Sequence, residues 1–272
     1  MSLKQRVVGL LAVGGDVLTA VNAASGLFPP LQFATRATLL ILSEIKQCKL
    51  PSGDKIPAIA LGTWKSRPGE TELARFTDRK TWGGILDRTL TALQTSYLDL
   101  YLVHWPVAFE KGTREVDADL TENPCTTVVE MVDKGKVRNI GVSNFNSRRL
   151  ENLTASPLKY QPAVNQVETN WLNSRPKLLE WSRNNGTLLE TYSPLGSDRQ
   201  VKDSFTIISW LKQRGVVVLP KSVIPPGIQE NIQVFELPRE AFDKIEKSAT
   251  SHKPQRVVNL SEQWGHDIFK DE

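Results

Sequence analysis

From Ile56 onward, apolar runs of strand length alternate with segments of helical spacing, and this alternation restricts the possible folds more than any other feature. The runs are short, rich in β-branched residues and nearly continuous, as expected for strands buried on both faces. Strands that alternate with helices are parallel and are joined by right-handed crossovers. The predicted strands are Ile56–Leu61, Asp99–His104, Asn139–Val142, Ala163–Val167, Thr187–Tyr192 and Val216–Pro220.

Amphipathic segments fit between these predicted strands. In the first of them, Ile85, Leu86, Leu90 and Leu93 share one helical face. Glycine follows three of the segments, at the place where a left-handed C-terminal cap is favoured. The predicted helices are Gly84–Thr95, Thr126–Lys134, Arg148–Thr154, Pro176–Asn184 and Ser204–Gln213, and the capping glycines are Gly135, Gly186 and Gly215.

Alternation alone fits both a closed barrel and an open doubly wound sheet, and the residues that follow the strands favour the barrel. In a barrel, the carboxyl ends of the strands converge on one face, where active sites lie. An open dinucleotide-binding sheet would instead be expected to carry GxGxxG after its first strand. Neither that motif nor the phosphate-binding motif GxxxxGK[ST] occurs in the sequence. We therefore predict an α/β fold of (β/α)8 TIM-barrel type. Polar or aromatic residues follow each strand from the second on: His104-Trp105, Ser143-Asn144, Gln166 to Asn170, Tyr192-Ser193 and Lys221-Ser222.

The composition is that of a globular protein and excludes several classes of partner. Apolar residues make up 40% of the chain and charged residues 24%, within the soluble globular range. The net charge is only +4, which is too balanced to indicate binding to nucleic acid or to a membrane surface. Cys48 and Cys125 are too few for a disulfide framework or a CxxC metal site. We therefore expect no nucleic acid, membrane or metal partner, and a cytoplasmic location.

The first 48 residues differ in composition from the rest. Asp16 and Glu44 are their only acidic residues, and the apolar stretches Val7–Val13 and Ala37–Leu42 are shorter than the ~18–20 residues of a membrane span. A poorly packed extension is the leading interpretation, and an N-terminal targeting segment is the alternative. We expect residues 1–48 to form this extension and residues 49–272 to form the barrel with a C-terminal tail.

Six strings, in order along the chain, resemble the aldo-keto reductase family, of the fungal glycerol dehydrogenase and xylose reductase kind. That family is a (β/α)8 barrel that reduces carbonyls with NADPH or runs the reverse oxidation. The resemblance therefore implies an NAD(P)H-dependent oxidoreductase for small aldehydes, ketones or polyols, as a monomer or homodimer. The strings are KIPAIALGTWKS (55–66), LDLYLVHWPVAF (98–109), KGKVRNIGVSNFN (134–146), PAVNQVETN (162–170), TYSPLGS (191–197) and PKSVIPPGIQENIQVF (220–235), and RVVNLSEQWGHDIF (256–269) resembles the family's C-terminal segment.

The resemblance also implies roles for individual residues. His104 would orient the substrate carbonyl, and Trp64 and Trp105 would line the substrate pocket. Amide side chains supply the paired donors and acceptors that a nicotinamide carboxamide needs, and lysine and serine can bind phosphate. For the cofactor, Ser143, Asn144 and Gln166 would bind the carboxamide, Tyr192 would stack on the ring, Ser193, Leu195 and Ser197 would wrap the pyrophosphate, and Lys221, Ser222, Val223, Glu230 and Asn231 would hold the adenosine end.

The chain departs from the family pattern in the region that should carry catalysis. The family's tetrad is Asp, Tyr, Lys and His, and only the histidine can be placed, at His104. The stretch between Gly62 and Asp99 is too short for the three crossovers that the family fits there, since one βαβ unit takes roughly 30 residues or more. We therefore expect an incomplete barrel of about six recognisable strands, with the region of the second and third strands deleted.

Two further departures concern the cofactor. The segment after Tyr192 is too short for the family's usual loop over the cofactor. Gly227 stands where the family often has an arginine for the 2′-phosphate, so we expect NADPH with NADH as the alternative. Two other interpretations stay open: a catalytically impaired barrel that binds a nicotinamide cofactor or a partner, and a truncated gene product.

Overall fold

A parallel sheet forms the centre of the protein. The computed structural model describes residues 47–60, 82–93, 95–109, 116–119, 126–197, 203–222, 225–261 and 267–269. Within these residues five strands lie in the order β3-β6-β7-β8-β9, and every neighbouring pair is parallel. The strands are β3 (Leu98–Val103), β6 (Val137–Ser143), β7 (Val164–Glu168), β8 (Leu188–Tyr192) and β9 (Val217–Val218).

A short segment extends this row beyond β9. Ile59 forms a parallel bridge with Val218, whose backbone N–H donates to the carbonyl of Ala58 at 3.0 Å and whose carbonyl accepts the N–H of Ala60 at 2.9 Å. The predicted strand Ile56–Leu61 therefore needs correction. Its first part is β2 (Lys55–Pro57), which pairs antiparallel with β1 (Gln47–Lys49). Two residues after Pro57 the chain joins the parallel row at Ile59.

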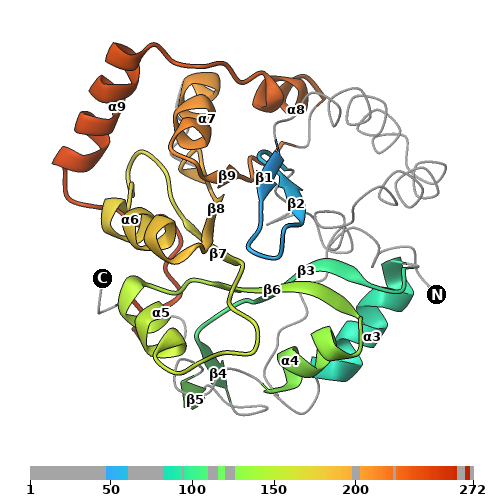
Figure 1. Cartoon of the computed structure of the whole chain (residues 1–272). Helices are drawn as coiled ribbons and strands as arrows, with labels where there is room; N and C mark the ends of the chain where they lie inside the picture. Colours follow the sequence, from blue (N-terminus) through green and yellow to red (C-terminus); the bar gives the residue numbers. More distant parts are fainter. Residues whose placement is uncertain are drawn as a thin grey trace.

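The row is curved, and its two ends share one interior. Figure 1 shows the strands following an arc with the helices on its outer side. Ala60 at one end and Leu100 and Leu102 at the other pack against a single apolar cluster that contains Val164 and Val217. Residues 61–81, which join the two ends in the sequence, lie outside the described residues. The described sheet is thus a strongly curved, six-segment portion of a barrel wall.

The helices cover the outer face of the sheet (Figure 1). The first two pack on β3 and β6 through a cluster that includes Leu86, Leu90 and Met131. All five predicted helices are present, with ends shifted by up to two residues, and Gly135, Gly186 and Gly215 have positive φ as a left-handed cap requires. The helices are α3 (Trp82–Leu93), α4 (Thr126–Asp133), α5 (Ser147–Thr154), α6 (Pro176–Asn185), α7 (Ser204–Gln213), α8 (Pro225–Ile232) and α9 (Arg239–Ser251). None of the helices in the described ranges is long and apolar enough to cross a membrane.

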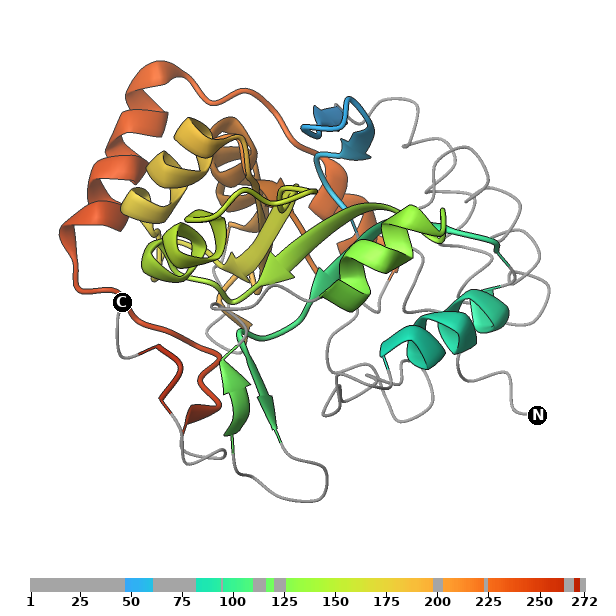
Figure 2. The same ribbon diagram turned by 60° about the horizontal axis from the view of Figure 1, so that its bottom comes forward.

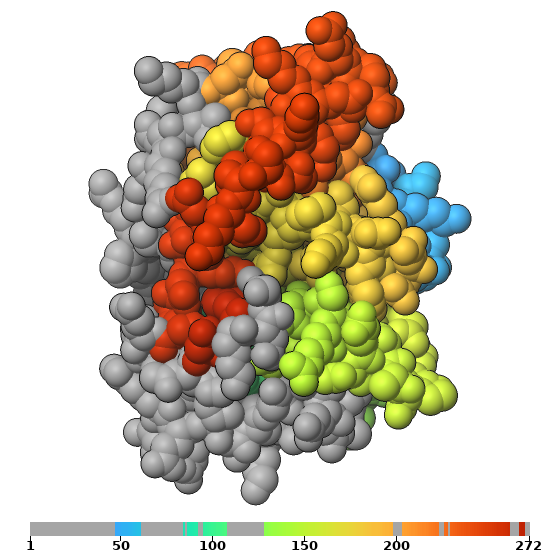
Figure 3. Space-filling model, turned by 90° about the vertical axis from the view of Figure 1, so that its left-hand side faces the viewer, coloured from blue at the N-terminus to red at the C-terminus, as the bar shows by residue number. Residues whose placement is uncertain are grey.

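Two features beyond the alternating pattern complete the fold. An antiparallel hairpin, β4 (Val107–Phe109) with β5 (Val116–Asp119), projects from the sheet beside the C-terminal segment (Figure 2). After α9 the chain returns along the surface beside α6 and α5 (Figure 3). The expected domain boundary after residue 48 falls inside β1, and the rest of the expected extension, residues 1–46, lies outside the described residues.

Candidate functional site

Asn144 links the carboxyl ends of three strands. Its Nδ2 donates to the backbone carbonyl of His104, after β3, at 2.9 Å and to Oγ of Ser143 at 3.1 Å. Its Oδ1 accepts the hydroxyl of Tyr192, at the end of β8, at 2.8 Å. The residue has a φ of 66°, a left-handed conformation that asparagine tolerates better than most residues. The structure therefore brings together four of the predicted site residues: His104, Ser143, Asn144 and Tyr192.

Gln166, on β7, belongs to the same group. It is the one residue of β7 that is partly exposed, and the other four are buried. Its backbone carbonyl accepts Oγ of Ser143 at 2.8 Å and the N–H of Asn144 at 2.9 Å. Its side-chain Nε2 donates to Oε2 of Glu190 at 2.6 Å. The backbone of Gln166 is therefore fixed by β6, and its amide is fixed by β8.

Glu190 is a site residue for which the sequence analysis gave no role. It is 7% exposed, and burial raises the pKa of its carboxyl to about 7, opposed by the hydrogen bond from Gln166. Its signal in the sequence is a charged residue inside an apolar strand, TLLETY (187–192). A buried carboxyl that titrates near neutral pH, in contact with a predicted cofactor ligand, is an uncommon arrangement for a purely structural residue.

His104 and Trp105 follow β3 and are both half-buried. Burial lowers the pKa of His104, so the neutral imidazole dominates at neutral pH. The Trp105 ring lies 5.3 Å from that of His104 and meets Phe269 edge-on at 6.2 Å between centroids. Phe269, Ile268 and Val107 form one apolar cluster against Trp105, so the C-terminal segment packs against this predicted pocket residue. The other predicted pocket residue, Trp64, lies outside the described residues.

The predicted pyrophosphate residues form a tight turn after β8. Ser193 and Ser197 have φ values of 49° and 53°, and their hydroxyls are hydrogen-bonded at 3.0 Å. Asn170, which had no predicted role, donates from Nδ2 to the carbonyl of Ser193 at 3.1 Å and so ties the turn to the end of β7. Leu195 packs against the apolar cluster of α7 and α9. The turn thus presents serine hydroxyls while its leucine is held by the protein.

The predicted adenosine residues lie one strand further along, after β9 and on α8. Lys221 and Glu230 are exposed, Ser222 is half-buried and Asn231 is buried. Val223 lies outside the described residues. The described cofactor candidates therefore lie on or after the consecutive strands β6, β7, β8 and β9, which is the order that one extended ligand across these strands would need.

The four tyrosines of the chain all lie within the described residues, and three of them are away from the carboxyl ends of the strands. Tyr101 packs outward against the α3 and α4 cluster, and the guanidinium of Arg138 lies 4.1 Å from the ring of Tyr97. The hydroxyl of Tyr160 donates to Asp133 at 2.9 Å on the surface. Tyr192 is therefore the single tyrosine at the candidate site.

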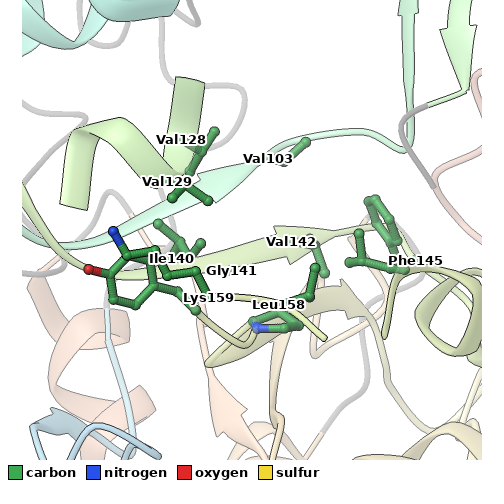
Figure 4. Close-up of a pocket in the computed structure, with 12 residues that line it drawn as sticks. Val103, Val128, Val129, Ile140, Gly141, Val142, Phe145, Leu158 and Lys159 are labelled. Carbon is green, nitrogen blue, oxygen red and sulfur yellow. The ribbon is translucent and has the colours of Figure 1, made fainter. Parts of the chain in front are cut away.

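An apolar groove on the outer face of the sheet is a different feature. It lies between α4 and α5 and is lined by side chains such as Val128, Leu153 and the outward-facing Val103 (Figure 4). The side chains of its polar rim residues, Lys159 and Tyr160, both donate hydrogen bonds to the carboxylate of Asp133. The groove lies on the opposite face of the sheet from the candidate site. In the described ranges, no group of three or more His, Cys, Asp or Glu side chains could hold a metal ion.

Comparisons with known proteins agree with this geometry. The family model described as "Aldo/keto reductase family" matches residues 78–206. The chain is 35% identical over 216 residues to glycerol 2-dehydrogenase (NADP(+)) of Hypocrea jecorina, covering 66% of this chain and 67% of that protein. It is 30% identical over 298 residues to aldehyde reductase YPR1 of Saccharomyces cerevisiae, covering 80% of this chain and 94% of that protein.

Solved structures show the same fold. The aldose reductase of Schistosoma japonicum superimposes with a TM-score of 0.73 at 25% identity, covering 84% of this chain and 100% of that one. An aldo-keto reductase of Bombyx mori in complex with NADP gives a TM-score of 0.70 at 20% identity, covering 83% of this chain and 98% of that one. The predicted α/β fold of (β/α)8 barrel type is therefore confirmed.

Proposed function

Because this chain belongs to the aldo/keto reductase family, we propose that it is an NAD(P)H-dependent oxidoreductase that reduces small aldehydes or ketones or oxidises polyols. The observation that carries the proposal is the hydrogen-bonded group of His104, Asn144, Gln166 and Tyr192 at the carboxyl ends of successive strands. The names of its relatives, a glycerol dehydrogenase that uses NADP(+) and an aldehyde reductase, support this substrate class.

The polar groups of the site fit a nicotinamide nucleotide. Since Nε2 of Gln166 is engaged by Glu190, its Oε1 is left to accept from the carboxamide NH2. The partly exposed ring of Tyr192 offers a stacking face, the hydroxyls of Ser193 and Ser197 suit the pyrophosphate, and Lys221 supplies a cation for phosphate. The bound cofactor would supply the hydride. NADPH is the expected form, with NADH as the alternative because Gly227 offers no charge to a 2′-phosphate.

His104 would act on the substrate. As a neutral imidazole it can donate a hydrogen bond to the carbonyl oxygen and so polarise and orient the carbonyl. Reduction leaves an alkoxide that needs a proton, and a positioned general acid contributes about 10²–10⁴-fold to such a step. Burial keeps imidazolium scarce at neutral pH, so His104 is a weak source of that proton.

One observation favours a second candidate, a catalytically impaired barrel that still binds the cofactor. Of the four tyrosines, only Tyr192 lies at the site, and its hydroxyl already donates to Asn144. The match to aldehyde reductase YPR1 extends over 298 positions, more than this chain has, which supports the loss of internal segments relative to that protein. Both candidates predict cofactor binding, and they differ in turnover.

Two measurements separate the candidates. The first is a thermal melt of the purified chain with and without NADPH, repeated with NADH. A ligand at 100 times its dissociation constant adds about 2.7 kcal/mol to a fold that binds it. A cooperative melt without any upward shift would contradict both candidates, since neither can act without the nucleotide.

The second measurement is NADPH-dependent reduction of glyceraldehyde by the wild type, by His104→Ala and by His252→Ala. The ring of His252, at the end of α9, packs on Trp171 and has no predicted role in binding substrate or cofactor, so it serves as the matched control. A wild-type rate that falls in His104→Ala and persists in His252→Ala supports the oxidoreductase. A wild-type rate no higher than that of His104→Ala contradicts it and leaves the cofactor-binding barrel.

A further inference from the structure

Glu190 lies inside the barrel, directly beside the proposed nicotinamide site. It pairs with Gln166 in the register of β7 and β8. On the same face of β8, Leu188 packs into the interior apolar cluster with Val164, and Tyr192 lies at the strand end. The carboxylate therefore occupies the layer between an apolar floor and the residues proposed to hold the cofactor.

The hydrogen bond between the two side chains has a direction. An amide presents a donor at one end and an acceptor at the other, so a carboxylate that takes the Nε2 end leaves Oε1 facing elsewhere. The backbone of Gln166 is already held by Ser143 and Asn144, so its remaining freedom lies in the side chain, whose amide can turn over. In its ionised form Glu190 has no proton to donate, and it therefore holds one orientation of Gln166.

We propose that Glu190 is a positioning residue that keeps Oε1 of Gln166 turned toward the nicotinamide carboxamide, so that protonation of Glu190 weakens cofactor binding. This inference rests on the proposed function, because it concerns the same nucleotide site. A protonated Glu190 can donate its own O–H to Oε1 of Gln166. The amide then turns, and its NH2 group meets the NH2 group of the cofactor, donor against donor.

The surroundings of Glu190 place this change near neutral pH. Its ladder neighbours Gln166 and Val217 are uncharged, and burial raises the pKa of the carboxyl to about 7. In the described part of the chain, the charge of Glu190 raises the pKa of the Cys48 thiol on β1, and the charge of Lys212 on α7 lowers it. Burial raises the pKa of that thiol, so it stays neutral between pH 6 and 8.

The test is the dissociation constant of NADH measured from pH 6 to pH 8 on the full chain. NADH is chosen because the 2′-phosphate of NADPH titrates near pH ~6 and would add its own pH dependence. With a pKa of about 7, roughly a tenth of Glu190 is ionised at pH 6 and roughly nine tenths at pH 8. The dissociation constant of the wild type should therefore be higher at pH 6 than at pH 8, by about tenfold when NADH binds the ionised form alone.

Three variants locate the effect. Glu190→Gln keeps an acceptor for Nε2 but cannot ionise, so its affinity should be nearly constant with pH. Gln166→Met removes the amide through which Glu190 acts, and should also remove the pH dependence while weakening binding. Cys48→Ser removes a titratable thiol whose pKa the Glu190 charge raises, and should keep the wild-type profile.

Each outcome decides the inference. If the pH dependence of the dissociation constant persists in Glu190→Gln, the inference is overturned. If the pH dependence persists in Gln166→Met, the charge of Glu190 acts on the nucleotide directly, and the positioning role is overturned as well. Should Glu190→Gln fail to melt cooperatively, the comparison of Gln166→Met with Cys48→Ser still decides it. Binding of NADH with no pH dependence overturns this inference alone, whereas no binding of NADH or NADPH at any pH overturns the proposed function as well.

Discussion

The carboxylate of Glu168 accepts the backbone N–H of Val257 at 2.8 Å, although the two residues are 89 positions apart. Its second oxygen accepts the N–H of Val258, also at 2.8 Å. Glu168 is fully buried at the end of β7. This two-point contact ties the C-terminal segment to the strand that carries Gln166, and the same segment of chain continues to Phe269 against Trp105.

Glu168→Gln is expected to release this contact. The amide of glutamine offers one acceptor oxygen, and its NH2 group would face the second backbone N–H, so a partly buried donor loses its partner. An unpaired buried donor costs about 1–3 kcal/mol. Urea unfolding should show a loss of this size, and amide hydrogen exchange at Val257 and Val258 should be faster. Glu180→Gln, on the exposed side of α6, should change neither, and unchanged exchange in Glu168→Gln would contradict the role of the contact.

Glu190→Gln is expected to stabilise the fold at high pH. The carboxyl pKa is about 7 in the folded protein against an ordinary value of 4.5, so the folded state keeps its proton to higher pH. The free energy of unfolding therefore falls as pH rises from about 4.5 to about 7, by about 3 kcal/mol in total. The stability gain of the variant should be about 2–3 kcal/mol larger at pH 8 than at pH 5. An equal gain at both values, or the same trend in the exposed Glu236→Gln, would refute this account.

Tyr192→Phe tests what the phenol contributes. The variant keeps the ring that would stack on the nicotinamide and loses the hydroxyl that donates to Asn144. We expect a loss of about 1 kcal/mol in stability and a small loss in cofactor affinity. Aldehyde turnover by the wild type, where measurable, should fall no further than cofactor occupancy does. Complete loss of turnover with cofactor still bound would instead identify Tyr192 as the proton donor.

Gly141→Ala should be strongly destabilising. A Cβ at this position of β6 would lie 2.5 Å from the backbone carbonyl of Val164 and 2.7 Å from the side chain of Leu102. The carbonyl belongs to a neighbouring strand and cannot move freely, so we expect a cost of about 1–3 kcal/mol or more in a denaturant titration. Gly84→Ala is the matched control, because a Cβ there meets nothing within 4 Å and alanine favours a helix by about 0.5–1 kcal/mol. A neutral Gly141→Ala would mean that β6 and β7 can separate.

The strand and helix pattern was predictable because strands buried on both faces appear in the sequence as short runs rich in apolar residues. The runs that became β3, β6, β7 and β8 are rich in apolar and β-branched residues, so their places were found to within two residues. The hairpins β1–β2 and β4–β5 are only three or four residues per strand, too short for an apolar period to show. Helix α9 is mostly polar, and only Ala249 in it is buried.

The candidate site was predictable where it depends on residue type at a strand end, and not where it depends on register. Ser143, Asn144 and Tyr192 come together because parallel strands end at the same edge. The contact of Gln166 with Glu190 needs the pairing of β7 with β8 to be known, since a shift by one residue would turn Glu190 to the opposite face. The contact of Glu168 with Val257 depends on the path of the chain after α9, which no local pattern fixes.

The bridge between Ile59 and Val218 joins two points more than half the chain apart. Closing so long a loop costs conformational entropy, and long-range pairing of this kind is slow to form. Strands β3, β6, β7, β8 and β9 pair in the order in which they occur in the sequence. The segment Ala58–Ala60 comes before all of them and pairs with β9, the last strand of the row. A polypeptide caught before that step would display β9 as an open edge, with unpaired main-chain groups ready to capture another strand.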